Sequence, residues 1–387
     1  MNAKKPPEES IETWPPVKNL VQEGLAHHRA GRLDRAWAAY QDVLRQDPDH
    51  ADALHYSGLV LLGRGNHAEA AKLMGRAAAA LGKDADFNAN FGVALRATGR
   101  QEQAKACFRR ALDAKPDHAL ALYNLGLLLI DERDWAGALA LFGRLAEKNP
   151  DSADVAHLLG QALAGSGRTA AGESPPPLNG CRVTPLGVPS HDDSLAAAAD
   201  RYREAIRLDA RALDARLDLA ELELAQGRPE AAEAVLAEAA GQTTNLNAPA
   251  LMAEIRERLG DAPGREKWLA RAKAVEPRAA TVFFQAAEEM RQAGAADAAE
   301  RLYRRCLMVE PEHPGALWAL NRLLPVIYDS EAEIENARRR YEAGLETLAA
   351  AVGEAKDAAA ADAALEGLGV STNFYLAYQE RNDRDLQ

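Results

Sequence analysis

Residues 85–118, ADFNANFGVALRATGRQEQAKACFRRALDAKPDH, decide the fold because they form one copy of a repeat. Residues 17–50, 51–84 and 119–152 align with this stretch without a gap, at a period of 34 residues. Self-similarity at a fixed period is the sequence signature of repeat architectures, in which each unit buries its apolar face against its neighbours. The repeat therefore predicts an array of stacked units.

Small and large residues occupy fixed positions of the repeat. Small residues at the eighth and twentieth positions allow two antiparallel helices to approach closely, because the interaxial distance depends on the side chains at the contact. Large residues at the twenty-fourth position are predicted to fill the core. The three sets are Gly24, Gly58, Gly92, Gly126 and Gly160; Ala36, Ala70, Ala104, Ala138 and Ala198; and Tyr40, Met74, Phe108, Phe142 and Tyr202.

Proline and glycine mark the predicted helix ends. Proline follows the second helix because it cannot continue a helix, and glycine between the helices can take the left-handed conformation. Each unit is thus predicted to be helix, tight turn, helix, tight turn. The prolines are Pro48, Pro116, Pro150, Pro277 and Pro311, and the turn glycines are Gly31, Gly65, Gly99, Gly167, Gly227, Gly260 and Gly294.

The pattern resembles the tetratricopeptide repeat, which has small residues at positions eight, twenty and twenty-seven and a proline near position thirty-two. The resemblance implies an all-α fold, a right-handed superhelical solenoid of antiparallel helix pairs. An aromatic content of 5% and abundant alanine and leucine also favour helices. The predicted domains are a disordered tail (1–16), repeats 1 to 4 with the first helix of repeat 5 (17–168), a proline-rich insertion loop (169–194), the second helix of repeat 5 with repeats 6 to 8 and the start of a ninth (195–324), and a helical junction segment (325–387).

The insertion at residues 169–194, TAAGESPPPLNGCRVTPLGVPSHDDS, has five prolines and no helical period. One interpretation is a polyproline II ligand or a flap over the binding groove. The simpler interpretation is a tolerated disordered insertion.

Charge and composition exclude several classes of partner. A net charge of -12 repels phosphate backbones and anionic headgroups, so neither nucleic acid nor a membrane is an expected partner. Residues 1–16 have no apolar stretch of the signal-peptide kind, and Cys107, Cys181 and Cys306 form no CxxC pair. A cytoplasmic location is therefore predicted.

The resemblance implies that the first helix of each repeat lines a concave groove that binds extended peptide segments. Side-chain amides at the sixth position would grip a peptide backbone, because an amide offers a donor and an acceptor together. The alternative is that these polar residues are only solvated, and no lysine and arginine set that would clamp a terminal carboxylate is evident across neighbouring repeats. The candidate binding residues are Gln22, Tyr56, Asn90, Asn124, Asp218 and Gln285, and Leu158 and Leu251 interrupt the series.

Chemistry-bearing motifs are missing from the sequence. No GxxxxGK[ST], HExxH or GxSxG motif occurs, and the phosphate-loop lookalike at residues 165–170 is explained as a turn. His50, His118 and His313 close their repeats and are interpreted as turn residues. Cys107 and Cys306 are interpreted as small apolar filler. The sequence thus predicts no catalytic residue, cofactor or metal site, and no enzyme in the chain as it stands.

The C-terminal segment has a different character. Residues 325–345, PVIYDSEAEIENARRRYEAGL, and 371–387, STNFYLAYQERNDRDLQ, resemble the junction between repeats and catalytic half in bacterial SPINDLY-like O-linked N-acetylglucosamine transferases. In that family a sugar-nucleotide transferase follows, whereas this sequence ends at Gln387, so no catalytic residue carries over. Phe374, Tyr375 and Tyr378 form either a docking stripe for a partner surface or an apolar stripe that folds back on the preceding helix.

The sequence as a whole predicts a protein–protein interaction scaffold whose concave groove binds extended segments of partner proteins. The alternative is the substrate-recruiting, non-catalytic part of a SPINDLY-like transferase, with a glycosyltransferase catalytic domain as its partner. A self-associating structural array is the third hypothesis.

Overall fold

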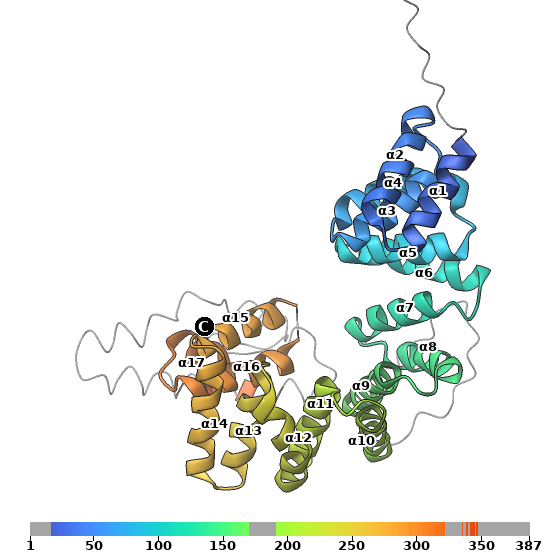
Figure 1. The fold of residues 1–387 in the computed structure, drawn as a ribbon. Helices are drawn as coiled ribbons and strands as arrows, with labels where there is room; N and C mark the ends of the chain where they lie inside the picture. The colour runs from blue at the N-terminus through green and yellow to red at the C-terminus, as the bar shows by residue number, and fades with distance from the viewer. Residues whose placement is uncertain are drawn as a thin grey trace, which may run out of the picture. The chain divides into compact units, whose positions relative to one another are not determined.

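The computed structural model describes residues 17–169, 191–293 and 295–321, and eight further residues between 335 and 346. Within these ranges all seventeen regular elements are α-helices, so the predicted all-α fold of paired helices is confirmed (Figure 1). The chain divides into two compact units, Met1–Gly165 and Ser166–Gln387. Each unit has its own hydrophobic clusters and is considered by itself.

Unit 1 is a stack of helix pairs. Each first helix packs against the second helix of its own pair, and that second helix packs against the next first helix. Successive first helices, α3, α5 and α7, also contact one another directly. The helices are α1 (Val17–Arg29), α2 (Leu33–Gln46), α3 (Ala51–Gly63), α4 (His67–Leu81), α5 (Ala85–Ala97), α6 (Gln101–Ala114), α7 (Ala119–Asp131), α8 (Trp135–Lys148) and α9 (Ala153–Thr169), of which the last continues into unit 2.

Unit 2 continues the alternation of helices and tight turns. Here α11 pairs with α12, α13 with α14 and α15 with α16. The helices are α10 (His191–Leu208), α11 (Leu213–Ala225), α12 (Pro229–Gln242), α13 (Asn247–Arg258), α14 (Ala262–Val275), α15 (Ala279–Gln292), α16 (Ala296–Val309) and α17 (Pro314–Asn321).

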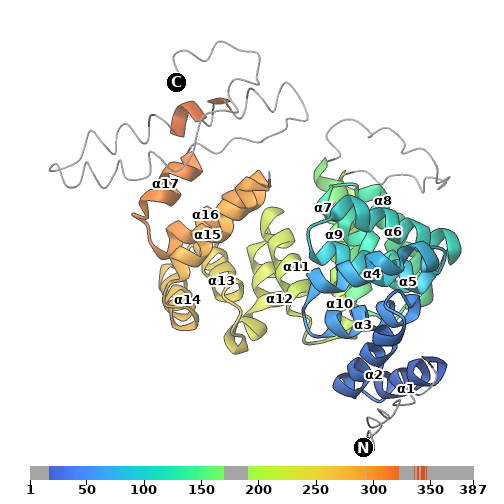
Figure 2. The same ribbon diagram turned by 90° about the horizontal axis from the view of Figure 1, so that it is seen from above.

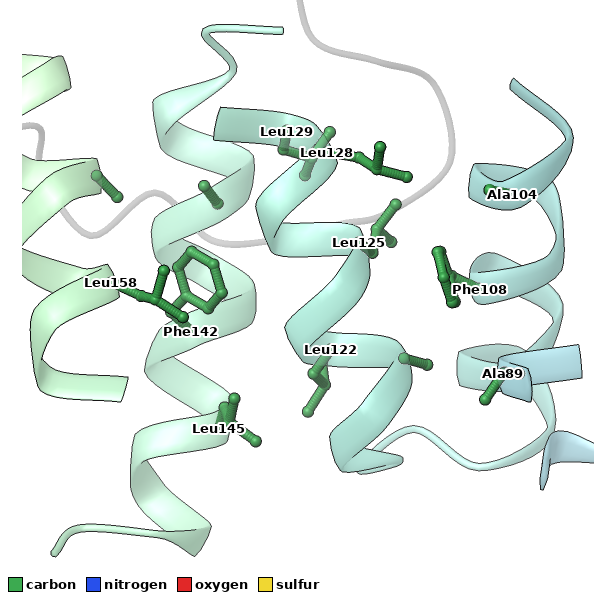
Figure 3. Packing of buried hydrophobic residues seen from close by; sticks show 14 of the residues in the cluster. Ala89, Ala104, Phe108, Leu122, Leu125, Leu128, Leu129, Phe142, Leu145 and Leu158 are labelled. Carbon is green, nitrogen blue, oxygen red and sulfur yellow. The ribbon is translucent and has the colours of Figure 1, made fainter. Parts of the chain in front are cut away.

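Close approach of the two helices in a pair depends on the glycine at position eight. A Cβ atom on Gly92 would lie 2.5 Å from the ring of Phe108, and one on Gly126 would lie 2.5 Å from the ring of Phe142. Both phenylalanines are 0% exposed. Figure 3 shows them within the core that joins α5 to α9. The predicted pairing of small and large positions is confirmed at these sites.

Most of the described helices end close to the glycines and prolines predicted to mark their ends. Gly31, Gly65, Gly99, Gly227 and Gly260 all take positive φ angles, between 69° and 75°. Helices α2, α6, α8, α14 and α16 each end two residues before a proline. The restriction that proline imposes on the residue before it explains this regular stop.

The turn of the fourth repeat uses a non-glycine residue, Arg133, with a φ of 60°. A left-handed conformation costs a residue with a Cβ roughly 1–2 kcal/mol, and the extra freedom of glycine in the unfolded chain offsets part of this. Arg133→Gly is therefore expected to raise the free energy of unfolding by about 0.5–1 kcal/mol. Urea unfolding followed by circular dichroism checks it, with Gly99→Ala as the opposite control, expected to lower stability by about 1 kcal/mol. A lower midpoint for Arg133→Gly contradicts the expectation.

The turn predicted at Gly167 and Arg168 is wrong, because α9 runs through both residues to Thr169. Here the glycines serve packing rather than a turn. A Cβ on Gly165 would lie 2.5 Å from the Trp135 ring, and one on Gly167 would lie 2.9 Å from Leu195. Helix α10 begins at His191, so the last four residues of the predicted insertion are helical as well.

Several predictions fall outside the described residues. These are the N-terminal tail at 1–16, the interior of the insertion at 170–190 with Cys181, and the turn at Gly294. The junction segment at 325–387 is also outside them apart from eight residues, and so is the whole of the stripe formed by Phe374, Tyr375 and Tyr378.

The last helix pair of unit 2 docks differently from the others. Each of the second helices α2, α4, α6, α10 and α12 contacts the first helix of the next pair. Between the last two pairs, α16 contacts both α13 and α14, whereas α15 makes at most weak contact with α14. Figure 2 shows α15 and α16 next to each other and close to α13 and α14. This orientation brings α16 near the first helices α11 and α13.

Candidate functional site

Helix α7 is apolar on nearly all sides, as its sequence ALALYNLGLLLID shows. A helix of this kind requires a covering partner all round. The core covers only part of its surface: Leu120 is 38% exposed, and Tyr123 and Leu127 are half-buried. These three residues lie at helical spacing on one face of α7. That face therefore presents apolar side chains to solvent.

An apolar row extends this face across the other first helices of unit 1. Leu25, Leu59, Val93 and Leu127 occupy the ninth position of four successive repeats, and each is half-buried. Because α5 contacts both α3 and α7, residues at the same position of these three helices follow one another across the stack, and α1 precedes them in the repeat order. The exposed sides of α1, α3, α5 and α7 that carry this row are called the first-helix surface of unit 1. The row lies three residues beyond the sixth position, so a prediction from the sixth position alone does not include it.

The sixth-position residues differ widely in their surroundings. Gln22 is exposed, Tyr56 and Asn90 are half-buried, and Asn124 is only 4% exposed. The amide Nδ2 of Asn124 donates to the carbonyl oxygen of Leu120 in its own helix, at 2.8 Å. Of the two asparagines, Asn90 has the more accessible side chain, and the amide of Gln22 is more exposed than either. The amide ladder stays a prediction.

In unit 2 the corresponding residues are Asp218 and Gln285. Asp218 on α11 is half-buried, and Gln285 on α15 is exposed. Because α15 docks differently from the other first helices, the two residues do not belong to one regular series of neighbouring helices. Their assignment to a binding groove also stays a prediction.

Aromatic rings meet where α1, α2, α3 and α5 converge. The rings of Tyr40 and Tyr56 stack, with centroids 5.6 Å apart and planes inclined by 24°. The ring of His55 lies edge-on to that of Phe87, at 5.3 Å. The Tyr40 side chain is 0% exposed, yet its hydroxyl has no hydrogen-bond partner among the described residues. The Nε2 atom of His55 lies 3.4 Å from Nδ2 of Asn90.

Three carboxylates, Asp52, Asp84 and Asp86, surround this aromatic group. Burial raises the pKa of the Tyr56 hydroxyl, and the negative charges of Asp52 and Asp84 raise it further. Burial also lowers the pKa of His55, although the same carboxylates oppose that shift. The surface at Tyr56 is therefore electronegative, and His55 beneath it is held neutral.

Acidification is expected to destabilise unit 1 through His55. Its pKa lies below the usual 6.5 in the folded chain, so between that lower value and 6.5 the unfolded chain binds more protons. The stability contributed by neutral His55 is present above pH 6.5 and is lost as the pH falls through the folded pKa. The urea midpoint should fall between about pH 7 and about pH 5, and this fall should be smaller for His55→Gln than for the original chain. An equal fall in both contradicts the assignment.

In unit 2 the equivalent surface is covered by the chain itself. Arg305 of α16, 5% exposed, donates from Nη2 to Glu221 of α11 at 2.5 Å and from Nη1 to Asn247 of α13 at 3.4 Å. Glu221 stands at the ninth position of its repeat, where unit 1 has its apolar row. Arg301 lies 3.7 Å from the same carboxylate. Helix α16 therefore lies over the first helices α11 and α13.

Removing the charge of Glu221 is expected to loosen the docking of α16. Arg305 would remain buried without its carboxylate, so Glu221→Gln should lower the local free energy of opening by about 1–3 kcal/mol. Hydrogen exchange of the α16 amides should quicken while exchange in α5 and α6 stays unchanged. Asp214→Asn, at an exposed carboxylate on the same helix, is the matched control. Unchanged exchange in α16 would show that the ion pair does not hold it.

The interpretation of the repeat-closing histidines as turn residues is confirmed. His50, His118 and His313 each precede a first helix, and their Nδ1 atoms accept a backbone N–H three residues on, at 3.1–3.3 Å. The filler role of Cys107 and Cys306 is also confirmed, since they are 1% and 0% exposed. Burial raises the pKa of both thiols, that of Cys306 to about 12.

The residues that the structure describes contain neither a metal-binding group of side chains nor a membrane-spanning helix. Among them no three histidine, cysteine, aspartate or glutamate side chains are grouped so as to hold a metal ion. No helix in the same part of the chain has the length and apolar character needed to cross a bilayer.

Paired helices, small residues at the pair contacts and an exposed first-helix surface define a class of helical-repeat protein. The sequence model of the tetratricopeptide repeat family matches residues 21–86, 90–141, 128–174 and 193–246, more than half of the chain. The chain belongs to the tetratricopeptide repeat family.

Solved structures resemble parts of the chain at low identity. A tetratricopeptide repeat protein from Parabacteroides merdae is 16% identical over 67% of this chain and 93% of its own, with a TM-score of 0.48. MamA from Desulfovibrio magneticus is 20% identical over 49% and 92%, with a TM-score of 0.40. YrrB, described as a tetratricopeptide repeat protein with an unusual peptide-binding site, is 19% identical over 51% and 88%, with a TM-score of 0.40. No curated protein matches the sequence.

Proposed function

We propose that this chain is a protein-interaction scaffold and that the first-helix surface of unit 1 binds extended segments of partner proteins. The apolar row of Leu25, Leu59, Val93 and Leu127, continued on α7 by the exposed Leu120, carries the proposal. Covering such side chains gains about 25 cal/mol for each Å² of apolar surface removed from water. A partner that supplies apolar side chains along this row is stabilised there.

The geometry of the row favours an extended partner. Packed helices lie about 8–10 Å apart, and an extended chain advances about 3.3 Å for each residue. An extended segment thus crosses from one first helix to the next in about three residues. The half-buried Asn90 amide adds a donor and an acceptor for the partner's backbone. Binding is then spread over several repeats, with one apolar contact in each.

The charged residue at the ninth position of α11 supports assigning partner binding to unit 1 and not to unit 2. Its ninth-position Glu221 is charged and paired with Arg305 of α16. A partner segment at this place would have to displace α16 and break that ion pair. The proposal therefore locates binding in unit 1.

A selection experiment tests the proposal. Random twelve-residue peptides displayed on phage are selected against the whole chain, and the strongest binder is then studied as a synthetic peptide. Hydrogen exchange with and without this peptide is expected to show protection in α3, α5 and α7. Protection confined to α11–α14, or no enrichment of any peptide over a selection without the protein, contradicts the proposal.

The second candidate is the substrate-recruiting, non-catalytic part of a SPINDLY-like protein O-linked N-acetylglucosamine transferase. The segments at 325–345 and 371–387 favour it, and the transferase catalytic domain is its proposed partner. The coding sequence beyond Gln387 tests this candidate. A transferase half in the same or an adjacent frame supports it, and the absence of one there and in neighbouring genes contradicts it.

A further inference from the structure

Two acidic residues lie beside the partly exposed ring of Tyr56. Asp52 precedes Tyr56 by four residues on α3, and Asp86 precedes Asn90 by four residues on α5, so each carboxylate shares a helix face with its neighbour. The contact between Asn90 and His55 joins the two faces. Both carboxylates are exposed. The two acidic groups therefore flank one aromatic surface.

The balance of charge at this surface is negative. Asp84 adds a third carboxylate, whose charge also acts on Tyr56. Arg29 is the cation that acts on the Tyr56 hydroxyl. The Nε2 atom of His118 lies 2.9 Å from Asp86. The exposed carboxylate of Asp52 makes no hydrogen bond or ion pair with another described residue and stays available.

The aromatic group also contains unused hydrogen-bonding capacity. The buried Tyr40 stacks on Tyr56, and its hydroxyl is unpaired among the described residues. The ring centroid of His28 lies 6.4 Å from that of Tyr40. The Nδ1 atom of His28 likewise has no hydrogen-bond partner among the described residues. The Tyr40 hydroxyl can accept a hydrogen bond, and the His28 Nδ1 atom can accept one when its ring carries the proton on Nε2. The ring of Tyr56 stacks against both Tyr40 and His55, so the charges of the nearby carboxylates supply most of the attraction for a cation here.

We propose that this site binds a lysine or arginine side chain of the partner segment, with the cation against Tyr56 and between the carboxylates of Asp52 and Asp86. The inference rests on the proposed function and adds the chemistry of the partner: a segment with apolar side chains for the row and a basic residue for this site. Segments rich in aspartate or glutamate are disfavoured, because their charges would face Asp52, Asp84 and Asp86.

The phage selection against the whole chain also tests this inference. Lysine and arginine are expected to be enriched in the selected peptides. The strongest binder and a version with its basic residues replaced by glutamine are then compared by fluorescence anisotropy. The replacement should weaken binding to the original chain about tenfold, and raising the salt concentration should weaken the basic peptide further.

In the double variant Asp52→Asn with Asp86→Asn, the basic peptide and the glutamine peptide should bind with equal affinity. Asp113→Asn, at an exposed carboxylate on the second helix α6, should leave it unchanged. Peptides selected without basic residues, or equal binding of the basic and glutamine versions, would overturn the cation site and leave the proposed function standing. If no peptide is selected at all, both fail. The comparison of the two peptides uses the original chain, so it tests the cation site even if a variant folds poorly.

Discussion

Phe142→Ala is expected to lower the free energy of unfolding by about 3–5 kcal/mol. The Phe142 side chain is 0% exposed and fills the space opposite Gly126, where a Cβ would come within 2.5 Å of its ring. Glycine has no side chain that can move into the cavity, so the space stays largely empty after truncation. Figure 3 shows Phe142 and Leu158 pointing toward each other, and that contact is lost as well.

Urea unfolding followed by circular dichroism measures the effect of Phe142→Ala. Each repeat contacts only its neighbours, so the loss should appear mainly in the transition that unfolds unit 1. Leu120→Ala, at a side chain 38% exposed, is the control and should change stability by at most about 0.5 kcal/mol. If both variants lower the free energy of unfolding equally, the contact between the glycine at position eight and the large residue at position twenty-four does not hold the two helices of a pair together.

Val93→Glu combined with Leu127→Glu is expected to weaken binding of a selected peptide about 100-fold. Each substitution removes an apolar contact from the row and places a charge where the partner must exclude water. Both side chains are half-buried and also pack against the core, so the stability of the double variant has to be measured beside its affinity. Peptide affinity is measured by fluorescence anisotropy, with circular dichroism to establish that the helices persist.

The matched control for that variant adds the same two charges on the second helices, as Gln103→Glu with Ala136→Glu. Both of these positions are exposed, on α6 and α8. The control should retain the affinity of the original chain. An equal loss of peptide affinity in the two double variants would show that the effect comes from net charge. The apolar row would then not be the binding surface.

The fold could be predicted because the repeat fixes local and tertiary structure together. A glycine at the position of Gly92 and a large residue at the position of Phe108 recur in every early copy, and the structure places each such pair in close contact. Gly167 misled the prediction because a glycine that permits close packing looks the same in sequence as one that permits a turn. Only the contact with Leu195 distinguishes the two roles.

The candidate site was less predictable from the sequence. Asn90 and Asn124 occupy the same position of their repeats, but Asn124 is buried and bonded to Leu120 in its own helix. The row of ninth-position residues was visible in sequence, yet its exposure depends on how closely successive first helices pack. The contact between Arg305 and Glu221 joins residues 84 positions apart and follows from the orientation of the last helix pair, which the repeat pattern does not encode.

Site-specific photo-crosslinking can locate a bound peptide on unit 1. A benzoylphenylalanine is introduced at Leu127 on the first-helix surface of unit 1 or at the exposed Arg109 on the second helix α6. Each variant is irradiated with a labelled selected peptide. We predict that the peptide crosslinks at position 127 and that an excess of unlabelled peptide suppresses the product, with little crosslinking at position 109. Crosslinking at position 109 alone, or at neither position while the peptide still binds, would contradict binding at the first-helix surface.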